Sequence, residues 1–156
     1  MSFDGPNSTL FMFLSTIAIS FTSALIPVVN IEVYVVFLGI VAPRSLLPLL
    51  LVTATMSHML GKSLMYLAGR SFDKLPYGKL KERVAAAKAK IGDRAALGAV
   101  VVFASALTGI PPFYLTTIAA GVWRFNFWYF FWVGFAGRLL RLGALIFIPQ
   151  LAGVAK

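Results

Sequence analysis

Three charged side chains lie inside long stretches of apolar sequence, where ionised groups are costly. Glu32 is the only acid between residues 5 and 72, and it follows a break that contains proline. Arg138 and Arg141 are three positions apart, so they share one face of a helix. A charged group at membrane depth is a functional hypothesis by default, because the bilayer core solvates charge poorly. An arginine fork suits bidentate binding of a phosphate or a carboxylate.

Each of these residues also has a structural interpretation. Asn30 can cap a helix whose first turn holds Glu32, where an acid suits the helix dipole. Arg138 and Arg141 can extend their aliphatic stems toward the membrane interface. This is harder for Arg138, because 13 uncharged residues separate it from Arg124. The functional interpretation makes Glu32 a proton-linked or gating acid, Arg138 a phosphate partner and Arg141 an auxiliary cation.

The single histidine, His58, shares a helix face with Thr55 and Lys62. Imidazole titrates close to neutral pH, so His58 is a candidate proton relay on a transport pathway. The alternative is a structural histidine within the helix packing. Lys62 is interpreted as a lysine at the boundary of the apolar segment, with its stem reaching toward the interface.

The elements that must position these residues are those of a membrane protein. Of the 156 residues, 60% are hydrophobic and only 12% are charged, whereas soluble domains average about 25% charged residues. Uncharged stretches cover residues 5–31, 45–61 and 95–123. One membrane helix needs about 20 residues. The sequence therefore predicts one polytopic, all-α integral membrane domain over residues 1–156.

Two of the apolar stretches are interrupted near their middle. The breaks consist of Pro27 and Asn30 in the first stretch, and of Thr108, Gly109, Pro111 and Pro112 in the third. Proline removes a backbone donor and clashes with the preceding turn, so each break should end one helix and start another. The arms of the second break, residues 95–107 and 113–123, are too short to span a bilayer. They predict a re-entrant hairpin, with a pair of kinked spanning helices as the alternative.

The two breaks begin a weak internal repeat of a hairpin followed by a longer helix. The segment from Ser23 to Gly39 resembles the segment from Ser105 to Gly121. Interrupted segments in corresponding positions of two halves indicate a transporter-type site near the bilayer midplane. Repeat 1 is placed at about residues 9–70 and repeat 2 at about residues 95–150.

The longer helix of each repeat is expected at residues 46–69 and 125–147. Helix N-termini bind anions through their free N–H groups and the helix dipole. The two N-termini that follow the breaks, together with Arg138, would therefore form a phosphate cradle within the membrane.

A basic linker joins the two repeats. Residues 62–94 contain nine of the fourteen lysines and arginines. Within them, residues 79–91 predict a basic amphipathic helix that lies on an anionic leaflet. The positive-inside rule then places residues 71–94 in the cytoplasm and the N-terminus outside. The hairpins would enter from opposite sides, so the repeats are inverted, and the expected location is the cell inner (plasma) membrane.

The composition argues against several other activities. The chain has no cysteine, and it shows no glycine-rich phosphate loop, metal-ligand spacing or Ser–His–Asp set. We therefore expect no enzyme activity, no metal and no cofactor. The formal charge of +9 is attributed to basic residues beside a membrane and not to nucleic-acid binding. The expected partners are membrane lipids, anionic or phosphate-bearing, and a homodimer is an open option.

The order and spacing of these segments resemble the DedA family, also called the VTT-domain or SNARE-associated Golgi protein family. The matching stretches begin at Ser23 and run through Pro27, Glu32 and Gly39. They continue over residues 61–70, 110–121 and 130–138. The resemblance covers about residues 23–143.

The resemblance implies two re-entrant hairpins that meet at the midplane, and a role in handling lipids. Members are linked to flipping of the undecaprenyl-phosphate carrier in bacteria and to phospholipid scrambling in eukaryotes. It also implies that Glu32 is functionally important. Many bacterial members carry arginines beside the second break, whereas residues 103–112 contain none here. Arg138 is the candidate replacement, and the alternative is a substrate that differs from undecaprenyl phosphate.

The expected function is therefore transport, by a flippase or scramblase that moves an anionic lipid or lipid carrier, with proton coupling as an option. A proton-coupled antiporter for small cations or drugs, with Glu32 as its exchange site, is one alternative. Another is a membrane scaffold without transport, in which Glu32 and Arg138 only pair.

Overall fold

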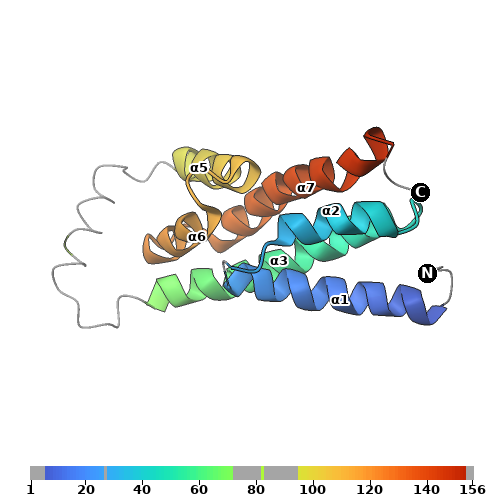
Figure 1. Ribbon diagram of the computed structural model, residues 1–156. Coiled ribbons are helices and arrows are strands. Elements are labelled where there is room, and N and C mark those ends of the chain that lie inside the picture. The colour runs from blue at the N-terminus through green and yellow to red at the C-terminus, as the bar shows by residue number, and fades with distance from the viewer. Residues whose placement is uncertain (1–5, 27, 72–81, 83–94, 154–156) are drawn as a thin grey trace. The chain divides into compact units, whose positions relative to one another are not determined.

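The computed structural model describes residues 6–26, 28–71, 82 and 95–153. Its regular secondary structure over these residues is entirely helical (Figure 1). The helices are α1 (Pro6–Leu25), α2 (Ile31–Val41), α3 (Leu47–Arg70), α5 (Ala95–Thr108), α6 (Phe113–Val122) and α7 (Phe127–Leu151). The predicted all-α architecture is thus confirmed for the described residues.

Both predicted breaks separate helices at the expected positions. The first lies between α1 and α2, and the second lies between α5 and α6. Pro27, which was assigned to the first break, lies outside the described residues. So does the predicted amphipathic helix at residues 79–91, apart from Glu82.

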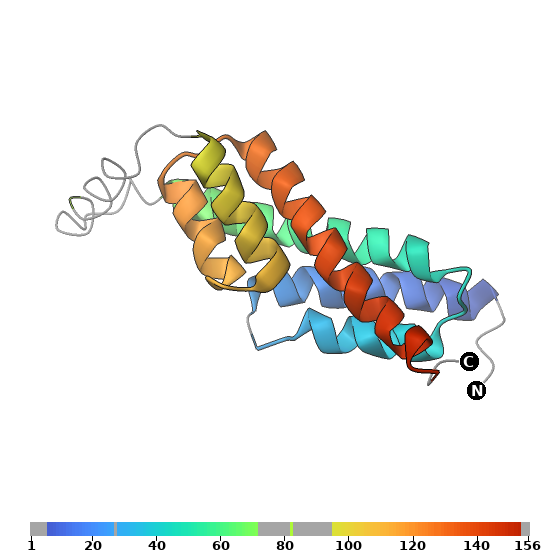
Figure 2. The ribbon, with the colours of Figure 1, turned by 90° about the horizontal axis from the view of Figure 1, so that it is seen from above.

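Two compact units make up the chain, and each is described by itself. The first consists of Met1–Gly61 and Arg138–Lys156, and the second consists of Lys62–Gly137. Each unit contains one helical hairpin, α1–α2 or α5–α6, and a part of both long helices, α3 and α7. The two helices of each hairpin pack against each other (Figures 1 and 2).

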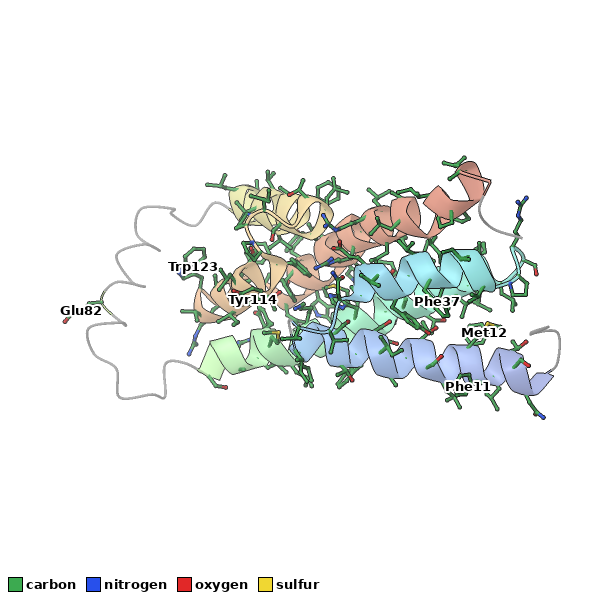
Figure 3. All side chains as sticks on the ribbon, viewed as in Figure 1. Phe11, Met12, Phe37, Glu82, Tyr114 and Trp123 are labelled. Atoms are coloured by element: carbon green, nitrogen blue, oxygen red, sulfur yellow. The ribbon has the colours of Figure 1, made fainter. Side chains whose placement is uncertain are left out.

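Aliphatic side chains form the core of the first unit. The members are Met12, Ile31, Val35, Leu38, Ala42, Leu47, Leu50, Leu51, Ala54, Leu142 and Ile146. Met12 is 4% exposed on the inner side of α1, whereas its neighbour Phe11 projects outward and is 68% exposed (Figure 3). The helices are thus apolar on their outer faces as well, which is typical of helices that face lipid.

Hydroxyl side chains within these helices bond to the backbone of their own helix. Thr16 Oγ1 donates to the Met12 carbonyl at 2.7 Å, and Thr55 Oγ1 donates to the Leu51 carbonyl at 2.8 Å. Such bonds satisfy a buried hydroxyl without a partner from another element. They allow polar residues to remain inside a helix that faces an apolar solvent.

Aromatic rings form the core of the second unit. Tyr66 stacks on Phe130 with ring centroids 5.1 Å apart, and Phe113 stacks on Phe130 at 6.3 Å. The fully buried Tyr66 also donates its hydroxyl to the Phe125 carbonyl. A buried tyrosine normally finds such a partner, and here the bond ties α3 to the residues just before α7.

Two described helices are long and apolar enough to cross a membrane, Asn7–Leu25 and Phe127–Pro149. Shorter apolar helices correspond to α2, α5 and α6. With 24 residues, α3 has sufficient length, but it is not one of the two. It carries His58 and Lys62 in its middle, which makes the helix more polar.

A glycine of each long helix packs closely against a hairpin, and the hairpin residues that the two glycines contact correspond to each other. A Cβ placed on Gly61 of α3 would lie 2.5 Å from the Ala24 Cβ and 2.9 Å from the Phe21 carbonyl oxygen. One placed on Gly137 of α7 would lie 2.8 Å from the Ala106 Cβ and 3.0 Å from the Phe103 carbonyl oxygen. The hairpin residues correspond, because Phe103 and Ala106 follow Phe21 and Ala24 by 82 positions.

The second helices of the hairpins show the same correspondence. Gly39 of α2 packs against the Ile146 backbone of α7, and Gly121 of α6 packs against the Tyr66 backbone of α3. Gly121 again follows Gly39 by 82 positions. Each hairpin is thus held by glycine contacts to both long helices, and any side chain at these positions would push the helices apart.

Candidate ion cluster in the first unit

The N-terminus of α2 positions Glu32. Asn30 is the N-cap residue, and its side-chain oxygen accepts the Glu32 backbone N–H at 2.9 Å. Glu32 lies in the first turn, where a carboxylate is stabilised by the helix dipole. The structural interpretation of Asn30 and Glu32 is therefore confirmed, and it does not exclude a functional role.

Both candidate arginines lie beside the Glu32 carboxylate. The Arg141 Nε donates to Glu32 Oε1 at 2.7 Å, and the Arg138 Nη1 lies 3.6 Å from the same oxygen. The arginines are separated by three positions on α7, so one face of α7 presents both guanidinium groups to α2. These three residues are called the ion cluster below.

Partial burial strengthens the electrostatic interactions within the ion cluster. The side chains of Arg138, Arg141 and Glu32 are 10%, 24% and 31% exposed. Coulomb attraction grows as the local dielectric constant falls, so these contacts are stronger than those of a surface pair. One carboxylate faces two guanidinium groups, which leaves the ion cluster with a formal charge of +1.

The two arginines differ in their contacts with Glu32 and in their burial. Arg141, predicted as an auxiliary cation, makes the shorter contact with Glu32, and the role of Arg138 as phosphate partner stays a prediction. Arg138 is the more buried of the two. The three-residue spacing predicted that the two arginines share a helix face. Which of them bonds to Glu32 depends on packing between α2 and α7.

His58 is a residue of α3 whose ring contacts α1. The His58 Nδ1 is 3.3 Å from the Ser23 Oγ and 3.3 Å from the Ser20 carbonyl oxygen. Its side chain is nearly fully buried. These contacts link the first hairpin to α3, and they are consistent with both a structural histidine and a proton relay.

Tyr34 lies near the ion cluster and was not predicted from the sequence as a residue of the site. Its hydroxyl is hydrogen-bonded with the Ser15 Oγ at 3.1 Å and with the Thr16 Oγ1 at 3.0 Å. Because Tyr34 lies two positions after Glu32, these bonds fix the start of α2 on α1. The signal in the sequence was a tyrosine within an apolar arm, with an adjacent serine and threonine on the preceding helix.

The residues of the second break are described within the second unit. Gly109 follows the end of α5 in a left-handed conformation, with φ of 80°, which ends the helix. The Thr108 hydroxyl bonds to the Ala104 carbonyl, and the Ser105 hydroxyl donates to the Pro111 carbonyl at 2.6 Å. Pro112 is the N-cap of α6 and makes no side-chain capping bond.

The described part of the chain shows no cluster of metal-ligating side chains. No group of three or more His, Cys, Asp or Glu side chains there could hold a metal ion. The chemistry that the ion cluster offers is the binding of an anion by two guanidinium groups, in competition with a carboxylate.

Apolar outer faces, long apolar helices and a partly buried ion cluster define a helical membrane protein. Comparison with family models gives the same class, because the VTT domain matches residues 26–151. The chain therefore belongs to the VTT-domain family of membrane proteins, and the predicted resemblance is confirmed. No curated protein and no solved structure matches the chain.

Proposed function

We propose that this chain is a flippase or scramblase that moves the phosphate-bearing headgroup of an anionic lipid across the membrane. The proposal is carried by one observation. A single carboxylate, Glu32, faces two arginines of an apolar helix, with contacts of 2.7 and 3.6 Å. Such groups are costly at membrane depth and are therefore expected to have a function there.

The ion cluster has the chemistry that an anionic headgroup requires. Guanidinium groups bind phosphate oxygens in bidentate geometry, as they bind a carboxylate. Glu32 therefore acts as an internal substitute for the headgroup and keeps Arg138 and Arg141 compensated when no lipid is bound. An incoming phosphate replaces the carboxylate on the arginines.

Proton coupling follows from the same exchange. A protonated Glu32 no longer compensates two guanidinium groups, so protonation favours binding of the phosphate and deprotonation favours its release. Glu32 would be the proton-linked or gating acid in this scheme. His58, buried beside Ser23 in the same unit, would be the proton relay.

The proposed architecture is two inverted repeats, each a re-entrant hairpin followed by a long helix. The matched glycine contacts support a repeat, because corresponding hairpin residues lie 82 positions apart. The lengths of α5 and α6, 14 and 10 residues, support a re-entrant second hairpin. The first hairpin is less symmetric, since α1 has 20 residues.

The charge distribution supports one orientation in the bacterial inner membrane or an equivalent plasma membrane. Residues 71–94 would be cytoplasmic and the N-terminus outside, because basic residues concentrate in this linker. The partners would be anionic lipids, undecaprenyl phosphate among them, and the chain would act without enzyme activity. Two short repeats could form the pathway alone or as a homodimer.

The proposal is tested by headgroup flipping in proteoliposomes. Labelled phosphatidylglycerol and labelled undecaprenyl phosphate are each incorporated, and a membrane-impermeant quencher reports the label in the outer leaflet. The proteins are the wild type, Glu32→Gln and Arg138→Ala, with Arg44→Ala as a matched control. Arg44 is an exposed arginine of the same unit, outside the ion cluster.

We expect the wild type to flip at least one of the two lipids. Glu32→Gln should lower the rate about tenfold or more, because the neutral side chain no longer competes with the phosphate and release slows. Arg138→Ala should lower it by a similar factor, because a charge-assisted contact with the phosphate contributes roughly 1.5–3 kcal/mol. Arg44→Ala should retain the wild-type rate. Folded wild-type protein that flips neither lipid would overturn the proposal.

The same proteoliposomes then separate the two alternatives. A flux of protons against a small cation that depends on Glu32 would assign the chain as an antiporter. Absence of any flux, with an effect of Glu32→Gln on stability alone, would assign it as a scaffold.

A further inference from the structure

The ring of His58 meets two groups of α1 through the same nitrogen. Its Nδ1 lies 3.3 Å from the Ser20 carbonyl oxygen and 3.3 Å from the Ser23 Oγ. All three residues are buried, with Ser20 fully enclosed. The two contacts therefore fix the orientation of the ring against α1, away from bulk water.

The contact with the carbonyl decides which ring nitrogen carries the proton. A backbone carbonyl only accepts hydrogen bonds, so the His58 Nδ1 must donate to Ser20. The Ser23 hydroxyl donates its single proton to the same carbonyl at 2.8 Å, which leaves it an acceptor toward His58. One N–H shared between two acceptors accounts for two long contacts of equal length. In the neutral ring, Nδ1 thus carries the proton and Nε2 carries the lone pair.

The serine at the corresponding place of the second hairpin has a different use. Ser105 follows Ser23 by 82 positions. Its hydroxyl donates to the Pro111 carbonyl at 2.6 Å and is hydrogen-bonded with the Thr116 hydroxyl at 2.9 Å. Ser105 therefore holds its own hairpin together across the break, whereas Ser23 holds a side chain of a long helix.

The long helices differ at the matching place. His58 precedes Gly61 of α3 by three positions, and Gly134 precedes Gly137 of α7 by the same number. A glycine thus occupies in α7 the place that the histidine occupies in α3. The repeated architecture does not require an imidazole there, which favours a role of His58 in the function over a role in packing alone.

The contacts on α1 limit how His58 can handle a proton. A ring that accepts a proton at one nitrogen and releases it from the other needs a base beside the second nitrogen. The Ser20 carbonyl is too weak a base for this, and the Ser23 hydroxyl could pass a proton only to that same carbonyl. Transfer through the ring toward α1 is therefore blocked, and the Nδ1–H bond stays intact.

We infer that His58 takes up and returns its proton at Nε2 alone, with the Ser23 hydroxyl and the Ser20 carbonyl as the positioning groups that hold the ring. This rests on the proposed function, in which His58 is the proton relay, and it names the atom that binds the proton. The Nε2 lone pair forms a bond with a proton from solvent water and gives an imidazolium. The same bond breaks on release, the electron pair returns to Nε2 and the proton returns to water.

The charged side chains around this step are mostly cations. No charged residue lies in α1 between Pro6 and Leu25. Lys62 follows His58 by one turn of α3. The described residues of the first unit supply one acid and three arginines, namely Glu32, Arg44, Arg138 and Arg141. An imidazolium would add to this positive charge, so proton uptake at His58 favours binding of an anionic headgroup.

The first experiment is ¹⁵N NMR of the full-length protein in lipid nanodiscs with ¹⁵N-labelled histidine. The chain has a single histidine, so both ring resonances belong to His58. We expect a protonated Nδ1 and an unprotonated Nε2 at alkaline pH, with acidification changing the protonation of Nε2 alone. Ser23→Ala should lower the ratio of the Nδ1–H form to the Nε2–H form about two- to tenfold, as expected for loss of one neutral hydrogen bond. Ser105→Ala, the matched control, should leave this ratio unchanged.

The second experiment separates holding the ring from binding the proton. The amide of His58→Asn lies near the place of Nδ1 and can donate to the Ser20 carbonyl, but it does not titrate. This variant should keep the wild-type melting temperature and lose the acceleration of headgroup flipping by a proton gradient. The amide of His58→Gln lies near the place of Nε2 and does not restore the contact with α1. That variant should lose both the stability and the acceleration.

An Nε2–H form with an unprotonated Nδ1 in the wild type would overturn the inference, whether or not the protein flips lipid. So would a His58→Asn protein that responds to the gradient as the wild type does, or a wild type whose flipping ignores the gradient. A protein that flips no lipid would overturn the proposed function. The NMR measurement would still decide which nitrogen binds the proton, and the wild type alone decides it if Ser23→Ala does not fold.

Discussion

Glu32 and Arg141 are 109 positions apart in the sequence, yet the arginine Nε donates to the carboxylate at 2.7 Å. The pair joins the first turn of α2 to the middle of α7 within one unit. Arg138 lies 3.6 Å from the same carboxylate oxygen. Removing the carboxylate therefore leaves two neighbouring cations without their shared counter-ion.

A double-mutant cycle should detect this pair. We expect Glu32→Gln and Arg141→Met each to lower stability, because the first removes the carboxylate that the two arginines share and the second removes the 2.7 Å charge-assisted bond. The double variant should be more stable than the sum of the single changes implies, with a coupling energy of about 1 kcal/mol. Unfolding in detergent, followed by helical circular dichroism, gives the three differences. Strict additivity would show that the contact contributes nothing to stability.

The close glycine contacts predict that alanine destabilises the protein at Gly61 and at Gly137 but not at Gly143. Gly61→Ala and Gly137→Ala should each destabilise the protein by about 1–3 kcal/mol, because the added methyl group meets a neighbouring helix. Gly143→Ala is the matched control, since its Cβ would meet only the Leu51 side chain at 3.4 Å. That change should be neutral or slightly stabilising, because alanine favours helix. Melting temperatures in detergent test this, and equal melting temperatures for all three variants would contradict it.

The hydroxyl of Tyr66 provides a test of the second unit by itself. Tyr66→Phe keeps the ring that stacks on Phe130 and removes only the bond to the Phe125 carbonyl. We expect a loss of about 1–3 kcal/mol, because the carbonyl loses its buried donor. Tyr129→Phe, an exposed tyrosine of α7, should change stability by less than about 0.5 kcal/mol. A Tyr66→Phe protein as stable as this control would show that the bond is not needed.

Tyr34 should influence the ion cluster through the position of α2. Tyr34→Phe removes the bonds to Ser15 and Thr16 but leaves every charged group in place. We expect slower headgroup flipping with normal lipid binding, because the start of α2 is less firmly held on α1. Combined flipping and lipid-binding measurements test this. Unchanged flipping would limit Tyr34 to a role in stability.

Much of the fold was predictable because its determinants are local. Proline at the breaks and the absence of charge in the arms predicted where α1, α5 and their partners end and begin. The correspondence of Ser23 and Ser105 also lies in the sequence. Only the structure shows that the long helices take part in this correspondence, because Gly61 and Gly137 contact corresponding hairpin residues.

The site was less predictable because its contacts are long-range. Glu32, Arg138 and Arg141 could be singled out by their apolar surroundings, but no spacing relates residues of α2 to residues of α7. Which of the two arginines lies closer to Glu32 therefore depends on the packing between α2 and α7. Lys62 was interpreted as a boundary lysine, and its near-complete burial was not predicted, because burial depends on how the helices pack.

The central claim is that the two arginines of the ion cluster handle a phosphate headgroup, and one measurement tests it most directly. Flipping rates of labelled phosphatidylglycerol and of labelled phosphatidylcholine are compared in proteoliposomes for the wild type, Arg138→Lys/Arg141→Lys and Arg138→Met/Arg141→Met. The account predicts that the wild type prefers the anionic lipid, that the lysine variant keeps part of this preference and that the methionine variant loses it. A methionine variant that still flips phosphatidylglycerol at the wild-type rate, in a folded protein, would contradict the account.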